Sequence, residues 1–219
     1  MGCGASKLST LYKATIEGDH ETVSDILAVG FSPNWMVPDT QMTLLHLAAW
    51  NNRPKVITAL IEAGANSNLR NIDGHTPLMV AAQRGGAKAA KALLEGGAKG
   101  SKRATYNNTA LHLAAKKGRA DTVAVLIDGG CKLNVHGQNG YTPLHNAVQR
   151  GHTETVEVML EKGANYSQPN AYGQNAFNLA EAGNNDATLE LLTRAKAQAK
   201  FKVAGAVVGL GVKAIMDAE

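Results

Sequence analysis

The chain has 219 residues, of which 44% are apolar and 18% charged, and its 22 Lys and Arg against 18 Asp and Glu give a formal net charge of +4. This composition is typical of a globular chain, and with only Cys3 and Cys131 it excludes a disulfide framework or a cysteine-rich zinc module. No apolar run approaches the length of a membrane-spanning helix, and the first residues lack the apolar stretch of a secretory signal, so we expect an intracellular, soluble protein.

The first predicted element is an N-terminal tether over residues 1–8. The sequence MGCGASK at residues 1–7 fits M-G-x-x-x-[ST], the acceptor pattern for N-myristoylation of Gly2 once Met1 is removed. With Cys3 it resembles the dually acylated start of Src-like kinases and G-protein α subunits, which implies palmitoylation of Cys3. One myristoyl chain binds membranes with an association constant of only about 10⁴ M⁻¹, so stable attachment needs the second chain. The prediction applies to a eukaryotic cell.

Residues 9–195 repeat with a period of 33. The hexapeptide TLLHLA at residue 43 recurs as TPLMVA at 76, TALHLA at 109 and TPLHNA at 142, with a weaker copy, NAFNLA, at 175. A sixth copy starts at residue 9, and the one extra residue before the next copy is placed in the Pro-bearing loop 31–42. A second apolar pattern with i, i+3, i+4 spacing follows and ends at a Gly, as in an amphipathic helix. Each repeat is therefore predicted to hold two short helices.

This period and this hexapeptide resemble the ankyrin repeat over residues 9–193. The resemblance implies an all-α solenoid of six helix-turn-helix repeats with short finger loops, in which the first and last repeats are caps. It also implies that His46, His112 and His145 are structural and bond their motif Thr and the loop backbone. The sequence holds no metal-ligand cluster, phosphate-binding Gly-rich loop or nucleophile–base pattern, so we expect no metal, cofactor or enzymatic activity.

Partner-binding residues are implied on the concave surface, which the family builds from finger tips and the ends of the inner helices. Carried onto this sequence, that surface includes Trp50, Ile72, His75, Arg84, Tyr106, Lys116, Lys117, Tyr141, Arg150 and Tyr172. Residues 84–119 hold nine basic residues against Glu95 alone, which indicates a protein partner with an acidic patch. Plain solvation and an anionic membrane are alternatives for these charges, whereas nucleic acid is not expected because no module that reads it is present.

Residues 196–219 form a basic, Gly-rich apolar tail. Ten uncharged residues run from Val203 to Val212, too few to span a bilayer. Three roles remain open: a helix that caps the sixth repeat, an anchor on an anionic membrane surface, and a partner-binding or self-associating segment.

These features predict a non-enzymatic scaffold or adaptor at the cytoplasmic face of a membrane. Acylated Gly2 and Cys3 would tether it there, and its concave surface would bind a protein partner. The alternative is a soluble regulatory inhibitor of an enzyme or transcription factor with no membrane role. Gly2 separates the two, because only the adaptor depends on an acyl chain.

Overall fold

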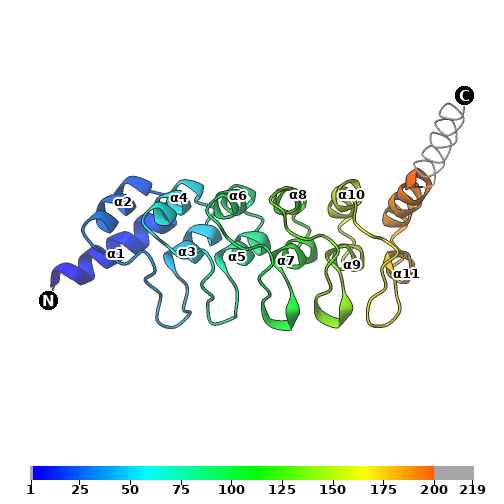
Figure 1. Ribbon diagram of the computed structural model, residues 1–219, viewed down its shortest axis with the longest axis horizontal. Helices are drawn as coiled ribbons and strands as arrows, with labels where there is room; N and C mark the ends of the chain where they lie inside the picture. Colours follow the sequence, from blue (N-terminus) through cyan, green and yellow to red (C-terminus); the bar gives the residue numbers. More distant parts are fainter. Residues whose placement is uncertain (1, 200–219) are drawn as a thin grey trace, which may run out of the picture.

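The computed structural model describes residues 2–199, and the side chains of residues 6–199, as a row of stacked helix pairs (Figure 1). The inner helices are α1 (Gly2–Glu17), α3 (Leu44–Trp50), α5 (Pro77–Arg84), α7 (Ala110–Lys116), α9 (Pro143–Gln149) and α11 (Ala176–Ala182). The outer helices are α2 (His20–Ala28), α4 (Pro54–Glu62), α6 (Ala87–Glu95), α8 (Ala120–Asp128) and α10 (Thr153–Glu161), and residues 186–199 are helical in the same layer. The predicted all-α solenoid of six helix pairs is confirmed.

The inner helices from α3 onward begin where the hexapeptides predict. The hydroxyl of Thr43 accepts the backbone N–H of His46 at 3.4 Å, and the same cap forms at Thr76 and at Thr142. Such a cap contributes about 1 kcal/mol, and Pro at the first helical position of α5 and α9 costs nothing because its missing N–H would have no partner there. Helices of seven or eight residues are not stable alone, so their stability comes from packing.

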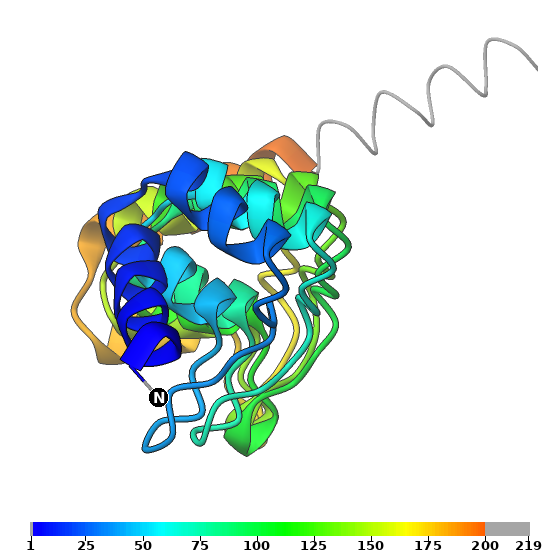
Figure 2. The same cartoon turned by 90° about the vertical axis from the view of Figure 1, so that its left-hand side faces the viewer.

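One apolar core runs through the described repeats from Leu11 to Leu192. Paired alanines such as Ala48 and Ala49 are completely buried, which lets neighbouring inner helices approach closely. Seen end-on, the two helix layers lie above the fingers, which all project in the same direction (Figure 2). The fingers and the inner helices thus form one continuous surface across the repeats.

The two ends of the solenoid depart from the predicted boundaries. Residues 2–8, assigned to the tether, are the first turns of α1, in which Thr10 bonds back to the carbonyl of Ser6 at 3.0 Å. At the other end residues 196–199 continue the last outer helix, and Lys196 lies 5.4 Å from the ring centre of Phe177. The tail roles were predicted for residues 196–219, of which residues 200–219 lie outside the described residues.

Candidate functional site

The concave surface carries most of the large apolar side chains that the structure leaves exposed. Trp50 lies at the end of α3, and Ile72, Tyr106 and Tyr172 lie at three different finger tips. The exposed fractions are 45% for Trp50, 63% for Ile72, 67% for Tyr106 and 65% for Tyr172. Aromatic side chains on an otherwise polar surface are typical anchors of protein interfaces, so this arrangement fits a binding surface.

Trp50 and Arg84 are brought together from successive repeats. Each is the last residue of its inner helix, and the guanidinium carbon of Arg84 lies 4.3 Å from the ring centre of Trp50. A groove of about 270 Å³ runs beside Trp50 between α1 and α3, lined by Tyr12, Ile16, Met42, Leu47, Trp50 and Asn51. A partner could place an apolar side chain in this groove and a carboxylate against Arg84.

Lys116, Lys117 and Arg150 extend the positive charge along the same surface. All three are exposed at the ends of α7 and α9, and none of them, nor Arg84, forms an ion pair within residues 6–199. A second groove, of about 320 Å³, opens between these helix ends and the finger tips; Lys116, Tyr141, Arg150 and Tyr172 are among its lining residues. Of the predicted partner-binding side chains, Trp50 and Arg84 form one site, and Lys116, Tyr141, Arg150 and Tyr172 line a second site between the fourth and fifth repeats. Ile72, His75, Tyr106 and Lys117 line neither groove.

Two of the predicted partner-binding residues, His75 and Tyr141, help to hold the fingers in place. The carbonyl of His75 bonds Nε2 of His46 at 2.9 Å, and the carbonyl of Tyr141 bonds Nε2 of His112 at 3.1 Å. The tyrosine ring also packs edge-to-face on His145, with ring centres 5.8 Å apart. Both side chains are half-buried, so they offer less contact area than the tips do.

The nine basic residues within residues 84–119 do not lie on one surface. Arg103 donates to the carbonyls of Asn107 at 3.1 Å and His136 at 2.8 Å, which ties two fingers together. Arg119 lies over Gly85, where a Cβ would come within 2.8 Å of its Cδ. Lys88 and Lys91 are exposed on the outer helix α6. Charge counting along the chain could not separate these roles, because they depend on which side of each helix pair a residue occupies.

The fingers form a connected row. The N–H of Ile72 donates to the carbonyl of Thr40 at 3.0 Å, the hydroxyl of Thr105 to the carbonyl of Asp73 at 3.0 Å, and the N–H of Ala171 to the carbonyl of Asn139 at 3.0 Å. Because neighbouring tips are fixed to one another, their side chains are presented to a partner with little loss of conformational freedom.

The three motif histidines are structural, as the resemblance implied. Nδ1 of His46, His112 and His145 lies 2.8, 2.9 and 3.1 Å from the hydroxyl of the motif Thr, and all three are buried. Burial lowers the pKa of each from its ordinary value of 6.5 to about 4. They are therefore neutral at pH 7. The described residues hold no group of His, Cys, Asp and Glu that could bind a metal, and no helix among them is long and apolar enough to cross a membrane.

Tyr106 has an unusual backbone conformation for a bulky residue, with φ 61° and ψ 26°. The equivalent residue one repeat later, Asn139, has φ 52°, and Asn tolerates this left-handed region better than Tyr. Because Tyr106 is mostly exposed, Tyr106→Asn is expected to raise the free energy of unfolding by about 0.5–1 kcal/mol. Urea denaturation would measure it, and a lower stability of the variant would show that the Tyr conformation carries no strain.

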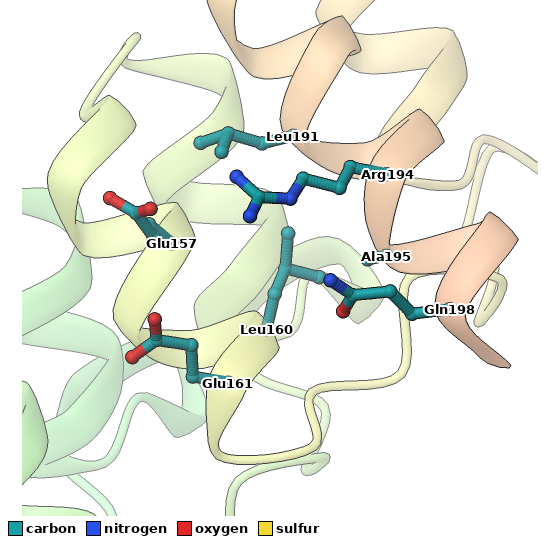
Figure 3. Close-up of a pocket in the computed structure, with 7 residues that line it drawn as sticks. All are labelled: Glu157, Leu160, Glu161, Leu191, Arg194, Ala195 and Gln198. Atoms are coloured by element: carbon teal, nitrogen blue, oxygen red, sulfur yellow. The ribbon is translucent and has the colours of Figure 1, made fainter. Parts of the chain in front are cut away.

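A third cleft lies away from the concave surface. It has a volume of about 130 Å³ and separates α10 from residues 186–199. Arg194 and Gln198 point from the last helix toward Glu157 and Glu161 on α10 (Figure 3). It is smaller than the two concave grooves, so the grooves remain the better candidates for binding.

Asn146 of α9 lines the groove between the fourth and fifth repeats but was not among the predicted partner-binding residues. It follows the motif His, at a position that holds Leu47, Val80 and Leu113 in the preceding repeats. An Asn at a position that is apolar in the three preceding repeats was the signal that could have found it, because such a residue is not needed for the core.

Comparison with known proteins agrees with the geometry. A family model described as ankyrin repeats, three copies, matches residues 45–136 and 111–202. The chain is 37% identical over 71 residues to NF-kappa-B inhibitor alpha from Sus scrofa, covering 32% of this chain and 21% of that protein. It is 35% identical over 77 residues to the E3 ubiquitin-protein ligase KEG from Arabidopsis thaliana, covering 33% of this chain and 5% of that one. It is 37% identical over 70 residues to glycerophosphocholine phosphodiesterase gde1 from Schizosaccharomyces pombe, covering 31% and 6%.

The chain thus spans less than a quarter of the length of each of these relatives. Their names describe an inhibitor, a ligase and a phosphodiesterase, so the likeness does not single out one activity for this chain.

Proposed function

Because the chain belongs to the ankyrin-repeat family, we propose that it is a non-enzymatic scaffold that binds a protein partner on its concave surface. In this proposal acyl groups on Gly2 and Cys3 hold the scaffold at the cytoplasmic face of a membrane. Ankyrin repeats are protein–protein interaction modules, and this part of the function follows from the family alone. The observation that carries the proposal further is the concave surface itself, with exposed aromatic residues beside cations that have no ion pair within residues 6–199.

The position of Gly2 supports the membrane part of the proposal. Gly2 begins α1 at one end of the solenoid, and the groove between the fourth and fifth repeats lies several repeats away (Figure 1). Acyl chains inserted in a bilayer at that end would leave the groove accessible to a partner. The tether would act by raising the local concentration of scaffold and partner on one surface, without any new contact between them.

The test is metabolic labelling in eukaryotic cells with a clickable myristate, followed by membrane fractionation. Gly2→Ala is expected to abolish both the label and membrane pelleting. Cys3→Ser is expected to keep the label but lose most of the pelleting, because one acyl chain binds only marginally. Ser9→Ala, just downstream of the pattern, is a control that should behave as wild type. A wild-type protein that is unlabelled and stays in the soluble fraction would refute the tether.

The alternative is a soluble regulatory inhibitor, and one observation favours it. NF-kappa-B inhibitor alpha, a protein named for inhibition, is 37% identical to this chain over 71 residues. An inhibitor of this kind would also use the concave surface but would not need Gly2. The same labelling experiment separates the two functions, because a soluble inhibitor would be unlabelled in the wild type and would fractionate alike in wild type and Gly2→Ala.

A further inference from the structure

We infer that the groove between the fourth and fifth repeats binds an extended, acidic peptide segment of the partner, and that Asn146 pairs with the backbone of that segment. The inference rests on one part of the proposed function, binding of a protein on the concave surface, and does not depend on acylation. Helices α7 and α9 and residues of three fingers form the groove, whose lining residues are Asn108, His112, Leu113, Lys116, Gln138, Asn139, Tyr141, Asn146, Gln149, Arg150 and Tyr172.

The walls of the groove are held in place by hydrogen bonds within the protein. Nε2 of His112 lies 3.1 Å from the carbonyl of Tyr141, and the N–H of Gln138 donates to the side-chain oxygen of Asn108 at 3.3 Å. The amide of Gln149 lies 3.4 Å from the Tyr141 hydroxyl. The groove therefore exists before a ligand arrives, and binding costs little reorganisation.

The charge of the groove indicates an acidic ligand. Lys116 and Arg150 lie at the helix-end side, no carboxylate lines the groove, and neither cation has an ion pair within the described side chains. The other polar groups are mainly neutral amides. Amides match the N–H and C=O groups of an extended peptide, whereas a nucleic acid would present one phosphate per nucleotide and require more than two cations. A peptide with one or two carboxylates is the better match.

Asn146 is the residue that the fold does not explain. Its side chain is half-buried in the groove, and within residues 6–199 its amide has no hydrogen-bond partner. The equivalent positions in repeats two, three, four and six are Leu47, Val80, Leu113 and Leu179, all apolar, whereas the first repeat has the exposed Lys13 there. A side-chain amide can donate and accept at once, which is the pattern needed to pair with one peptide unit of a bound chain.

The experiment is selection of a phage-displayed random dodecapeptide library on the full, unmodified chain, followed by fluorescence polarisation with the most enriched peptide. We expect the selected peptides to be rich in Asp and Glu. We expect Asn146→Leu to weaken binding about tenfold, the worth of one hydrogen-bonded peptide unit, without lowering the melting temperature. The double variant Lys116→Glu/Arg150→Glu should weaken it at least about hundredfold, whereas the control Lys88→Glu/Lys91→Glu, with the same charge change on outer helix α6, should bind as wild type.

Three results would overturn the inference: no enriched peptide or peptides without acidic residues, unchanged affinity in Asn146→Leu, or equal loss in the control on α6. The last would mean that charge alone attracts the peptide. The proposed function can survive each of these results, because a partner could still bind at the Trp50–Arg84 site. Conversely, a failed acyl-labelling experiment would leave the peptide measurements unaffected.

Discussion

Acidification from pH 6.5 to about 4 is expected to remove most of the folding free energy of this protein, because three buried histidines must remain neutral in the folded state. The pKa of His46, His112 and His145 is lowered to about 4 by burial, whereas the unfolded chain takes up protons near 6.5. The folded state therefore binds fewer protons in this window, so stability is complete above pH 6.5 and falls as the pH decreases toward 4. Each histidine contributes a loss of about 3 kcal/mol, and the three together approach the whole stability of a typical domain.

The clearest variant for this prediction is His145→Met. Met79 already occupies the equivalent position of another repeat, where it is 1% exposed and its sulfur lies 3.5 Å from the N–H of Thr76. Nε2 of His145 has no hydrogen-bond partner within the described part of the chain, so little is lost at neutral pH. Urea denaturation at a series of pH values should show a slope near pH 5 that is shallower than wild type by about 1.4 kcal/mol per pH unit, the effect of one proton. An unchanged slope would show that His145 does not titrate with unfolding.

Reversing the charge of Arg84, Lys116 and Lys117 is expected to reduce partner capture at least about hundredfold at low salt. Each reversal replaces an attraction of roughly 1 kcal/mol between the cation and an acidic partner with a repulsion of similar size. The loss should diminish as salt is added, because these charges are exposed and are screened over about 10 Å at 0.1 M ionic strength. The melting temperature should change by only a few degrees, since the residues contribute to no ion pair among the described side chains and Arg84 loses only its contact with Trp50.

The measurement is quantitative proximity labelling in cells, comparing the triple Glu variant with wild type. A matched control carries Lys88→Glu, Lys91→Glu and Lys99→Glu, three exposed lysines with the same total charge change but no place in either concave groove. Proteins that lose labelling in the concave variant but keep it in the control are direct partners. If both variants lose the same proteins, or neither does, the concave cations do not select the partner.

Much of the candidate site could be predicted from sequence because repetition fixes register. Once the hexapeptides are aligned, each residue has a counterpart at a known place on a helix or finger, and Trp50, Ile72, Tyr106 and Tyr172 are exposed where the alignment puts them. The roles of the histidines followed in the same way. Asn146 was missed for a different reason: its column in the alignment looked like core, and only the open groove shows that its amide is accessible.

The sequence by itself determined the period, the helix starts and the order of the repeats, because these depend on local chemistry: Thr caps, Pro at the first helical position, and apolar spacing within one helix. Only the tertiary structure decided which charges share a surface. Arg84 meets Trp50 across two repeats, while Arg103, which belongs to the same basic stretch of the sequence as Arg84, ties two fingers together. Such pairings depend on how one repeat stacks on the next. The local sequence patterns determine the helices within a repeat, but no single pattern determines this stacking.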